Sequence, residues 1–294
     1  MSYKKDLAII ILNYNNYNLT IALVNHIKQL KYPICIVDNA SENDSWEILN
    51  NAFGKQKEIF LIKSKTNGGY SKGNNIGIRY AIKKIPSLKY IAIMNPDIEL
   101  CDNFTFEKLC TVLEQDEQLA GITAITIFNN ILDSKNTCAS KLLTSKQLVI
   151  ADIKGFSKIV SRHYKRLKAN RNGVAYVDKI QGCFFIIKRD AFEKIGLFDE
   201  NVFLYFEEDI IAYKLKKMGM KLGVHIETCI KHNHQIKDDE MLDIEKRKFH
   251  NKCTLESKKY YMLNIREEQY SLWRLSYILD SFTRGVKDLY LKLK

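Results

Sequence analysis

Residues 6–15 decide the fold of this chain: Asp-Leu-Ala-Ile-Ile-Ile-Leu-Asn-Tyr-Asn. A short apolar run ends here in polar side chains, which is typical of a strand that is buried on both faces and stops at a sheet edge. Three more such runs follow, and helix-like segments separate them. The runs lie at 34–38, 59–64 and 90–95, and the segments at about 17–30, 42–53 and 71–84. This alternation predicts an α/β fold with a mostly parallel sheet, flanked by helices in right-handed crossovers.

The rest of the chain mixes shorter elements with a helical end. Its patterns predict helices at 103–115 and 208–218, and strands at 120–128, 177–188 and 221–230. From Asp238 onward the only glycine or proline is Gly285, which favours helices. We therefore expect a domain of residues 1–235, with halves of about 1–100 and 101–235, and a C-terminal helical extension of residues 236–294.

Composition excludes several classes of protein. The 294 residues are 46% hydrophobic and 27% charged, which is ordinary for a globular chain and argues against global disorder. No apolar run reaches the roughly 20 residues of a membrane-spanning helix. The seven cysteines are odd in number and lack a CxxC pair. They indicate a protein of the reducing cytoplasm rather than a disulfide framework or a cysteine zinc site.

Positive charge is concentrated in one segment. Lysine and arginine exceed aspartate and glutamate by 12 over the chain, and residues 141–173 hold nine basic residues against one acid, Asp152. Such a block favours an anionic partner, which is a nucleic acid, a phosphate-bearing ligand or a membrane surface.

Two segments carry an apolar stripe at helical spacing. Residues 154–171 have a purely basic polar side, so they form either a core-facing helix or a helix on an anionic bilayer. Near the C-terminus the flanking charges have both signs, which favours a core-facing helix. This second stripe consists of Leu275, Ile278, Leu279, Phe282, Val286, Leu289 and Leu293.

Polar clusters follow all four of the first strands. Because carboxyl ends of parallel strands meet at one sheet edge, where ligands bind, we expect these clusters to lie together. They are Asn13-Tyr-Asn15, Asp38-Asn-Ala-Ser41, the four-glycine loop 67–77 and Asn95-Pro-Asp97.

Each cluster has a functional and a structural interpretation. Asp38 suits hydrogen bonds from a base or a ribose, or caps the next helix. Ser41 with Asp44 predicts a capping box for that helix. The loop at 67–77 lets backbone approach a ligand and opens a helix that favours anions, yet it matches neither GxxxxGK[ST] nor GxGxxG. Asp97 suits Mg²⁺ or Mn²⁺ held together with diphosphate oxygens, or is simply a turn residue.

Two further clusters lie in the second half. Phe206-Glu-Glu-Asp209 places three acids before a helix, either to stabilise its N-terminus or to supply a general base. His232-Asn-His234 ends a predicted strand, where a histidine is either a metal ligand or an ordinary surface residue.

In this order, seven blocks resemble the inverting glycosyltransferases of family 2, which have the GT-A (Rossmann-like) fold. The bacterial branch that adds sugars, often rhamnose, to surface polysaccharides is especially similar. The resemblance covers about residues 6–235 and is specific for the family but not for the sugar. The blocks are 9–15, 37–41, 67–77, 94–98, 182–192, 196–200 and 203–209.

The resemblance implies roles for the matching residues. Asn95-Pro-Asp97 stands at the DxD position of the family with asparagine as its first member, so Asp97 would bind Mg²⁺ or Mn²⁺, with His232 as a second ligand. Glu207-Glu208 stands at the Glu-Asp pair that contains the base. Since glutamate replaces aspartate at 208, the base is open among Glu208, Glu207 and Asp209, in that order. The residues that would hold the nucleotide-sugar are Asn13, Tyr14, Asn15, Asp38, Asn39, Gly69, Gly73, Asn74, Asn95 and Asp97.

The implied reaction moves a sugar from a dTDP- or UDP-sugar to a glycan or polyprenyl-diphosphate-linked acceptor with inversion. The protein would be cytoplasmic, and the basic residues 141–171 would contact the anionic inner face of the cell membrane.

Three other functions compete with this one. A sugar nucleotidyltransferase would have a glycine-rich loop with arginine after the first strand, where this chain has Asn13-Tyr-Asn-Asn. Nucleic acid is not an expected partner, because the charge is confined to one segment and no DNA or RNA motif is present. The last alternative is a non-catalytic glycosyltransferase-like partner subunit or a membrane-surface binding protein.

Overall fold

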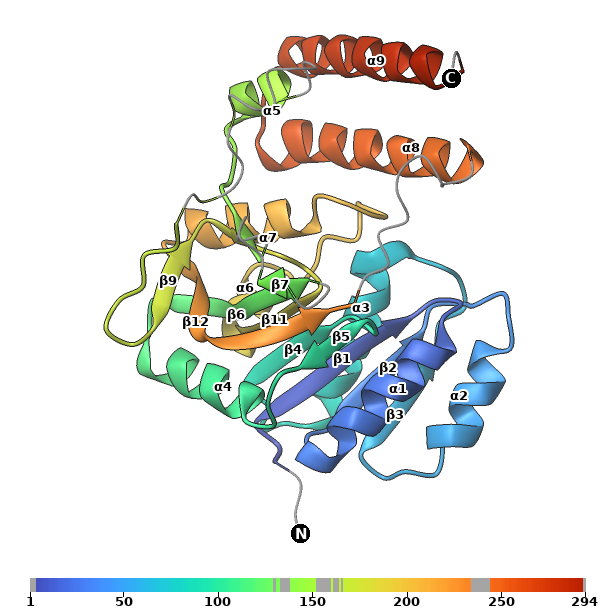
Figure 1. Ribbon diagram of the computed structural model, residues 1–294, viewed down its shortest axis with the longest axis vertical. Coiled ribbons are helices and arrows are strands. Elements are labelled where there is room, and N and C mark those ends of the chain that lie inside the picture. Colours follow the sequence, from blue (N-terminus) through green and yellow to red (C-terminus); the bar gives the residue numbers. More distant parts are fainter. Residues whose placement is uncertain are drawn as a thin grey trace.

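The computed structural model has one large sheet at its centre, helices against both faces of that sheet, and a stack of helices beyond one end (Figure 1). It describes residues 4–128, 131–132, 138–151, 160, 164, 166–233 and 244–292. The predicted α/β class, with a mostly parallel sheet and C-terminal helices, is confirmed.

The elements follow the predicted order with small shifts at their ends. The strands are β1 (Leu7–Asn13), β2 (Ile34–Asp38), β3 (Ile59–Lys63), β4 (Tyr90–Met94), β5 (Ile98–Leu100), β6 (Leu119–Phe128), β7 (Ile131–Leu132), β8 (Ala139–Ser140), β9 (Val174–Val177), β10 (Lys179–Ile180), β11 (Phe184–Lys188) and β12 (Lys221–His232). The helices are α1 (Tyr17–Ile27), α2 (Ser45–Phe53), α3 (Gly69–Lys84), α4 (Thr105–Gln115), α5 (Ser145–Ala151), α6 (Arg189–Lys194), α7 (Glu207–Lys217), α8 (Ile244–Tyr260) and α9 (Tyr270–Lys292), with the short turns η1 (Lys28–Leu30) and η3 (Tyr261–Ile265).

The sheet joins a parallel half to a mixed half. Its strand order is β3-β2-β1-β4-β11-β6-β12-β5, with β7 beside β6 and β9 beside β12. The first four strands are parallel, and Asn13 pairs with Asp38, so their carboxyl ends share one edge. β11 runs antiparallel to β4 and pairs Phe184 with Met94. The start of β11 therefore lies at the edge where β4 ends.

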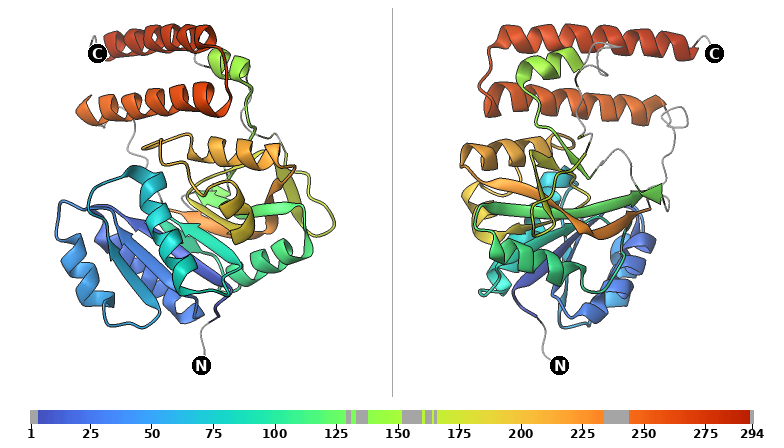
Figure 2. Two further views of the ribbon diagram at one scale, coloured as in Figure 1. Left: turned by 180° about the vertical axis from the view of Figure 1, so that it is seen from behind. Right: turned by 60° about the vertical axis from the view of Figure 1, so that its left-hand side comes forward.

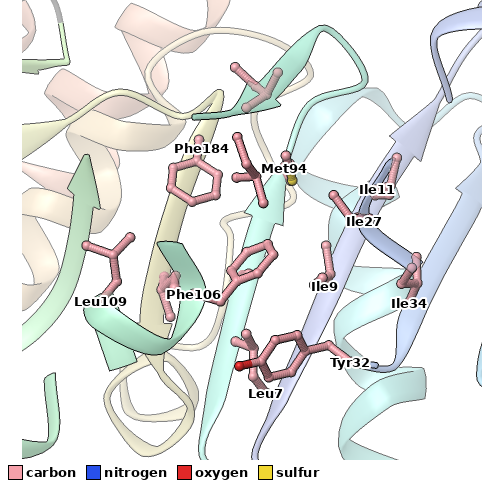
Figure 3. Packing of buried hydrophobic residues seen from close by; sticks show 14 of the residues in the cluster. Leu7, Ile9, Ile11, Ile27, Tyr32, Ile34, Met94, Phe106, Leu109 and Phe184 are labelled. Carbon is pink, nitrogen blue, oxygen red and sulfur yellow. The ribbon is translucent and has the colours of Figure 1, made fainter. Parts of the chain in front are cut away.

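The two faces of the sheet carry separate cores. Leu7, Ile9 and Ile11 face one core, shared with α1, α2 and α4 (Figure 3). Ala8 and Ile10 face the other, shared with α3, α6 and α7. All five are completely buried. Burial on both faces explains why this strand is an unbroken apolar run in the sequence.

The C-terminal helices form two further layers. α8 lies beyond α7, and α9 lies beyond α8 with α5 beside it (Figure 2). A third apolar cluster connects these layers through Leu148 of α5, Ile210 of α7 and Tyr261 of η3. Within the described ranges no helix is both long and apolar enough to cross a membrane.

Two local predictions from the sequence were wrong. The strand expected at 177–188 is three strands, because successive parts of it pair with different partners. β9 pairs with β12, β10 pairs with β8 in a separate two-stranded sheet, and β11 pairs with β4 and β6. Between β9 and β10 the N–H of Asp178 donates to Tyr164 Oη. The capping box is absent, since α2 begins at Ser45 and Ser41 Oγ donates to Asp38 instead.

The stripe of α9 is a third correction. Leu275, Ile278 and Phe282 were expected in a core but are 49%, 54% and 73% exposed. The side chains of Val286, Leu289 and Leu293 lie outside the described residues.

Only part of the other amphipathic segment, 154–171, lies within the described residues. Of its apolar stripe, Val160, Tyr164 and Leu167 pack against buried clusters.

Candidate functional site

The ends of β1 and β2 are joined by a buried hydrogen-bond network. Asp38 Oδ1 accepts from Asn13 Nδ2 at 2.9 Å and from Ser41 Oγ at 2.6 Å, and Asp38 Oδ2 accepts from the backbone N–H of Ser41 at 3.2 Å. Asn13 Oδ1 in turn accepts from Thr20 Oγ1 at 2.9 Å. Because Asn13 and Asp38 are fully buried, their side chains fix the shape of the two loops.

A pocket of about 350 Å³ opens at this edge between β1, β2 and α3. Tyr14, which is 40% exposed, Asn39 and Gly69 line it. Asn39 Nδ2 donates to Asn67 Oδ1 at 2.9 Å and to the carbonyl of Gly69 at 3.1 Å, which holds the glycine-rich segment against β2. Phe249 of α8 also lines this pocket. Aromatic walls with a few fixed polar groups suit a planar ligand that carries polar substituents.

The glycines of this segment serve contacts within the protein. Gly69 begins α3 with φ +78°, and a Cβ there would lie 2.1 Å from the carbonyl oxygen of Phe203. Gly73 lies inside α3, where a Cβ would be 2.5 Å from a methyl group of Leu12. Of these two glycines, Gly69 also lines the open pocket and Gly73 does not.

Asp97 and His232 meet beyond the end of β4. β12 runs antiparallel to β5 and places His232 opposite Ile98. Asp97 Oδ2 lies 3.3 Å from His232 Nε2, and the two side chains are only 16% and 9% exposed. A carboxylate oxygen and an imidazole nitrogen at this spacing fit two ligand positions of a divalent cation, with phosphate oxygens available for others. No set of three or more His, Cys, Asp or Glu side chains in the described parts of the chain could hold a metal by itself.

The three acids that begin α7 have different surroundings. Glu207 is 5% exposed, and its burial, followed by the nearby charge of Glu208, raises the pKa of Glu207 to about 8. Asp209 Oδ2 pairs with Lys179 Nζ at 2.6 Å. Glu208 Oε1 accepts a hydrogen bond from the backbone N–H of Gly182 at 3.0 Å, and its side chain is half-buried.

Gly182 and Cys183, just before β11, connect these groups. The N–H of Gly182 binds Glu208, and its carbonyl accepts from Tyr70 Oη at 2.6 Å. The carbonyl of Cys183 accepts from the backbone N–H of Asn95 at 2.8 Å. Two consecutive residues thus join the acid cluster, the first turn of α3 and the Asn95–Asp97 turn.

Tyr70 lies amid the acidic groups of the site. Burial, followed by the charges of Glu208, Glu207 and Asp97, raises the pKa of Tyr70 well above its usual value. The phenol therefore stays neutral and keeps donating to Gly182.

The loop before the acids is strained and is held by the C-terminal helices. Tyr205 and Phe206 have φ angles of 73° and 67°, in a left-handed region that costs non-glycine residues about 1–2 kcal/mol each. Tyr205 Oη hydrogen-bonds His250 Nδ1 of α8, and the ring of Phe206 packs on Tyr261 at 5.4 Å between centroids. Ser257 Oγ of α8 donates to the backbone of the loop at 2.8 Å. These contacts offset the strain.

A second pocket, of about 380 Å³, lies at the start of α7. Glu208, Asp209, Lys141 and Lys179 line it together with Thr254 of α8. Its mixture of carboxylates and ammonium groups suits a ligand rich in hydroxyls or carrying an anionic group.

The structure brings most of the expected residues to one edge. Of the ten residues expected to hold the nucleotide-sugar, three line the first pocket: Tyr14, Asn39 and Gly69. Gly73 and Asn74 are instead buried in α3, where Asn74 Nδ2 donates to the carbonyl of Tyr70. Asn15 does not line it either, and its Oδ1 accepts from the backbone N–H of Glu42 at 2.8 Å.

Sequence reasoning missed three residues of the site. Tyr70 lies inside the glycine-rich block at 67–77, so its position in the sequence could have identified it as a site residue. Lys179 and His250 come from segments without a motif, and only the folded chain places Lys179 beside Asp209 and His250 beside Tyr205.

Comparison with known proteins gives the same class. The chain matches the model of glycosyl transferase family 2 over residues 8–196. The low-salt glycan biosynthesis hexosyltransferase Agl10 of Haloferax volcanii is 26% identical over 221 residues, which are 74% of this chain and 64% of that relative. The chain therefore spans less than two thirds of the relative that it matches.

Two solved structures share the fold. One is GalNAc-T7 with UDP, GalNAc and Mn²⁺, with a TM-score of 0.58 and 15% identity over 89% of this chain and 56% of that one. The other is the mannosyltransferase PcManGT from Pyrobaculum calidifontis in complex with GDP-Man and Mn²⁺, with a TM-score of 0.55 and 13% identity over 95% of this chain and 75% of that one.

The fold is of the GT-A type, in which a parallel α/β half and a mixed half are joined in one sheet. The chain belongs to glycosyl transferase family 2, whose model covers more than half of it.

Proposed function

We propose that this chain is an inverting glycosyltransferase. It transfers a sugar from a nucleoside diphosphate-sugar to a hydroxyl of a glycan or lipid-linked glycan in bacterial surface polysaccharide synthesis. The observation that supports this best is the junction at Gly182–Cys183, which ties the expected donor edge, Asp97 and Glu208 into one network. Transfer needs a leaving-group site and a base that converge on one carbon atom, and this network supplies both.

Glu208 is the base in this proposal. At neutral pH Glu207 holds its proton, since its pKa is raised to about 8, and Asp209 is engaged by Lys179. Glu208 is the remaining acid and lines the second pocket. It takes the proton of the acceptor hydroxyl while that oxygen attacks C1 of the sugar from the face opposite the diphosphate. The C1–oxygen bond to the diphosphate breaks in the same step, so one displacement inverts the anomeric centre.

The first pocket takes the nucleoside in this proposal. Tyr14 offers an aromatic face, and Asn39 offers amide groups fixed by Asn67 and Gly69. The N-terminus of α3 favours the diphosphate, because the dipole of the helix attracts anions. Solved relatives bind UDP and GDP-Man, which supports a nucleotide-sugar donor, and dTDP- or UDP-sugars are the donors we propose.

Asp97 and His232 would hold a divalent cation, Mg²⁺ or Mn²⁺. Both solved relatives contain Mn²⁺. Such a cation, when bound, neutralises the charge that develops on the departing diphosphate. Asp97 and His232 are already in contact, so little ordering of side chains is required.

The acceptor and the cellular location complete the proposal. A glycan carried on a polyprenyl diphosphate would enter the second pocket, where Lys141 offers positive charge and Lys179 is paired with Asp209. The protein would act in the cytoplasm, with basic residues of 141–171 near the inner face of the cell membrane. Residues 1–235 would form the catalytic domain, and residues 236–294 a helical extension that supports its acid loop.

Donor hydrolysis tests the proposal. The protein is incubated with UDP-, dTDP- and GDP-sugars, with and without Mn²⁺ or Mg²⁺, and released nucleoside diphosphate is quantified. We expect release from one donor, dependence on the metal, and loss of release in Asp97→Ala. If no donor is hydrolysed, calorimetry measures binding instead. Absence of nucleotide binding in both assays would refute the transferase and favour a non-catalytic partner or a membrane-binding protein.

A further inference from the structure

The outermost helix, α9, carries an exposed apolar stripe. Its buried side mixes polar and apolar residues: Trp273, Ser276 and Asp280 are 9%, 2% and 9% exposed. Leu275, Ile278 and Phe282 are 49%, 54% and 73% exposed. Spacings of three and four residues align these three on one side of the helix.

In the layer beneath α9, α8 also buries a charged residue, Lys258, which is 7% exposed. α9 lies beyond α8 in both figures and is the outermost of the elements that the structure describes (Figure 2). A soluble surface rarely lines up apolar side chains in this way unless a partner covers them.

Charge indicates which partner covers the stripe. Arg274 on α9 and Lys146 on the adjacent α5 are exposed, and the whole chain carries a net charge of +12. In the sequence the stripe continues as Val286, Leu289 and Leu293, beside Arg284, Lys287 and Lys292 and one acid, Asp288. A second copy would bring two positive surfaces together, whereas an anionic bilayer has the opposite sign.

We propose that α9, with α5 beside it, docks this protein on an anionic lipid bilayer. The helix lies in the plane of the interface with Leu275, Ile278 and Phe282 inserted, since none of the described helices can span a membrane. This contact does not depend on the proposed reaction. Apart from α5, it also differs from the surface at 141–171 that the sequence suggested.

Docking in this way would suit the proposed acceptor. The second pocket is lined by Leu148 of α5 and Thr254 of α8, the elements next to α9, together with Glu208. A lipid-linked acceptor would then reach Glu208 from the membrane side. This consequence rests on the proposed function, but the docking itself does not.

Vesicle flotation of the full chain without donor tests the docking. The vesicles are phosphatidylcholine alone, or phosphatidylcholine with phosphatidylglycerol in equal amounts. The variant is Ile278→Gln with Phe282→Gln, and the matched control is Ile226→Gln with Phe104→Gln. Ile226 and Phe104 are also exposed, at 42% and 62%, and lie on other elements.

We expect the native chain and the control to float with the anionic vesicles. The partition coefficient of the α9 variant should be at least about tenfold lower. Binding should also weaken as salt is raised, because screening shortens the reach of the basic residues. Equal flotation of variant and control would overturn the proposal. The proposal would also be overturned if light scattering showed that the native chain is a dimer and the α9 variant a monomer, because a second copy would then cover the stripe.

Discussion

The two sides of the candidate site are built in different ways. At the donor side, neighbouring loops of the parallel sheet hold each other, as Asn13 and Ser41 both donate to Asp38. At the acid side, the loop before Glu208 is held by side chains 45 and 53 residues further along the chain, His250 and Ser257. The donor side thus follows from the sheet itself, whereas the acid side requires the C-terminal helices.

The largest expected effect is on chemistry at the acid side. Replacing Glu208 with glutamine removes the base but keeps a side chain that can accept from Gly182, so transfer should fall about a thousandfold. Donor affinity should stay near normal, because the first pocket is untouched. Steady-state transfer and calorimetry measure the two quantities.

The matched control is Asp209→Asn at the next position. It breaks the ion pair with Lys179 but leaves Glu208 in place, so it should lower transfer much less. Full activity of Glu208→Gln, or a larger loss in Asp209→Asn, would reassign the base.

The donor side could be predicted from the sequence, whereas the acid side could not, because the two sides are held by different kinds of contact. Loops that follow parallel strands lie at the same edge of the sheet. The predicted parallel strands β1, β2 and β4 were therefore enough to expect Asp38 and Asp97 at one edge. The position of His250 depends on how α8 packs on the loop at Tyr205, a contact between distant segments with no local pattern. The same reasoning failed for α9, since spacing reveals an apolar stripe but not which way it faces.

The glycine-rich segment shows a subtler failure. Its four glycines suggested close approach to a ligand, yet Gly73 is needed because α3 packs closely against Leu12. A glycine pattern indicates that something approaches the backbone and does not say whether it is a ligand or the protein itself.

The second effect is a dependence of stability on pH at the acid side. The pKa of Glu207 is about 8 in the folded protein, against 4.5 for a free side chain, so the native state binds more protons between these values. The free energy of unfolding should therefore fall as pH rises from about 5 to 8, by an amount on the order of 3 kcal/mol. Chemical denaturation across this range measures it.

Glu207→Gln isolates the responsible group. A neutral amide needs no proton, so this variant should lose less stability over the same range and should be more stable than the native chain at pH 8. A parallel decline of both proteins would show that another group titrates.

The third effect concerns the donor side. Asp38→Ala leaves the buried Asn13 Nδ2 and Ser41 Oγ without their shared acceptor, which should cost about 2 kcal/mol of stability. Urea denaturation gives the value. The control is Asp44→Ala, an exposed aspartate in the same loop whose side chain makes no capping bond, and its effect should stay within about 0.5 kcal/mol.

The smallest effect tests whether α8 holds the acid loop. His250→Ala and Tyr205→Phe each break the bond between the two side chains, and each should lower kcat about tenfold by releasing the left-handed turn before Glu208. His26→Ala removes an exposed histidine of α1 that lines neither pocket, and it should have no effect. If the pair acts as one unit, the double variant should be no slower than either single variant, because the second substitution finds the bond already broken. Additive losses would mean that His250 acts on the donor pocket it lines and not through the loop, and the contrast between the two sides would then no longer depend on α8.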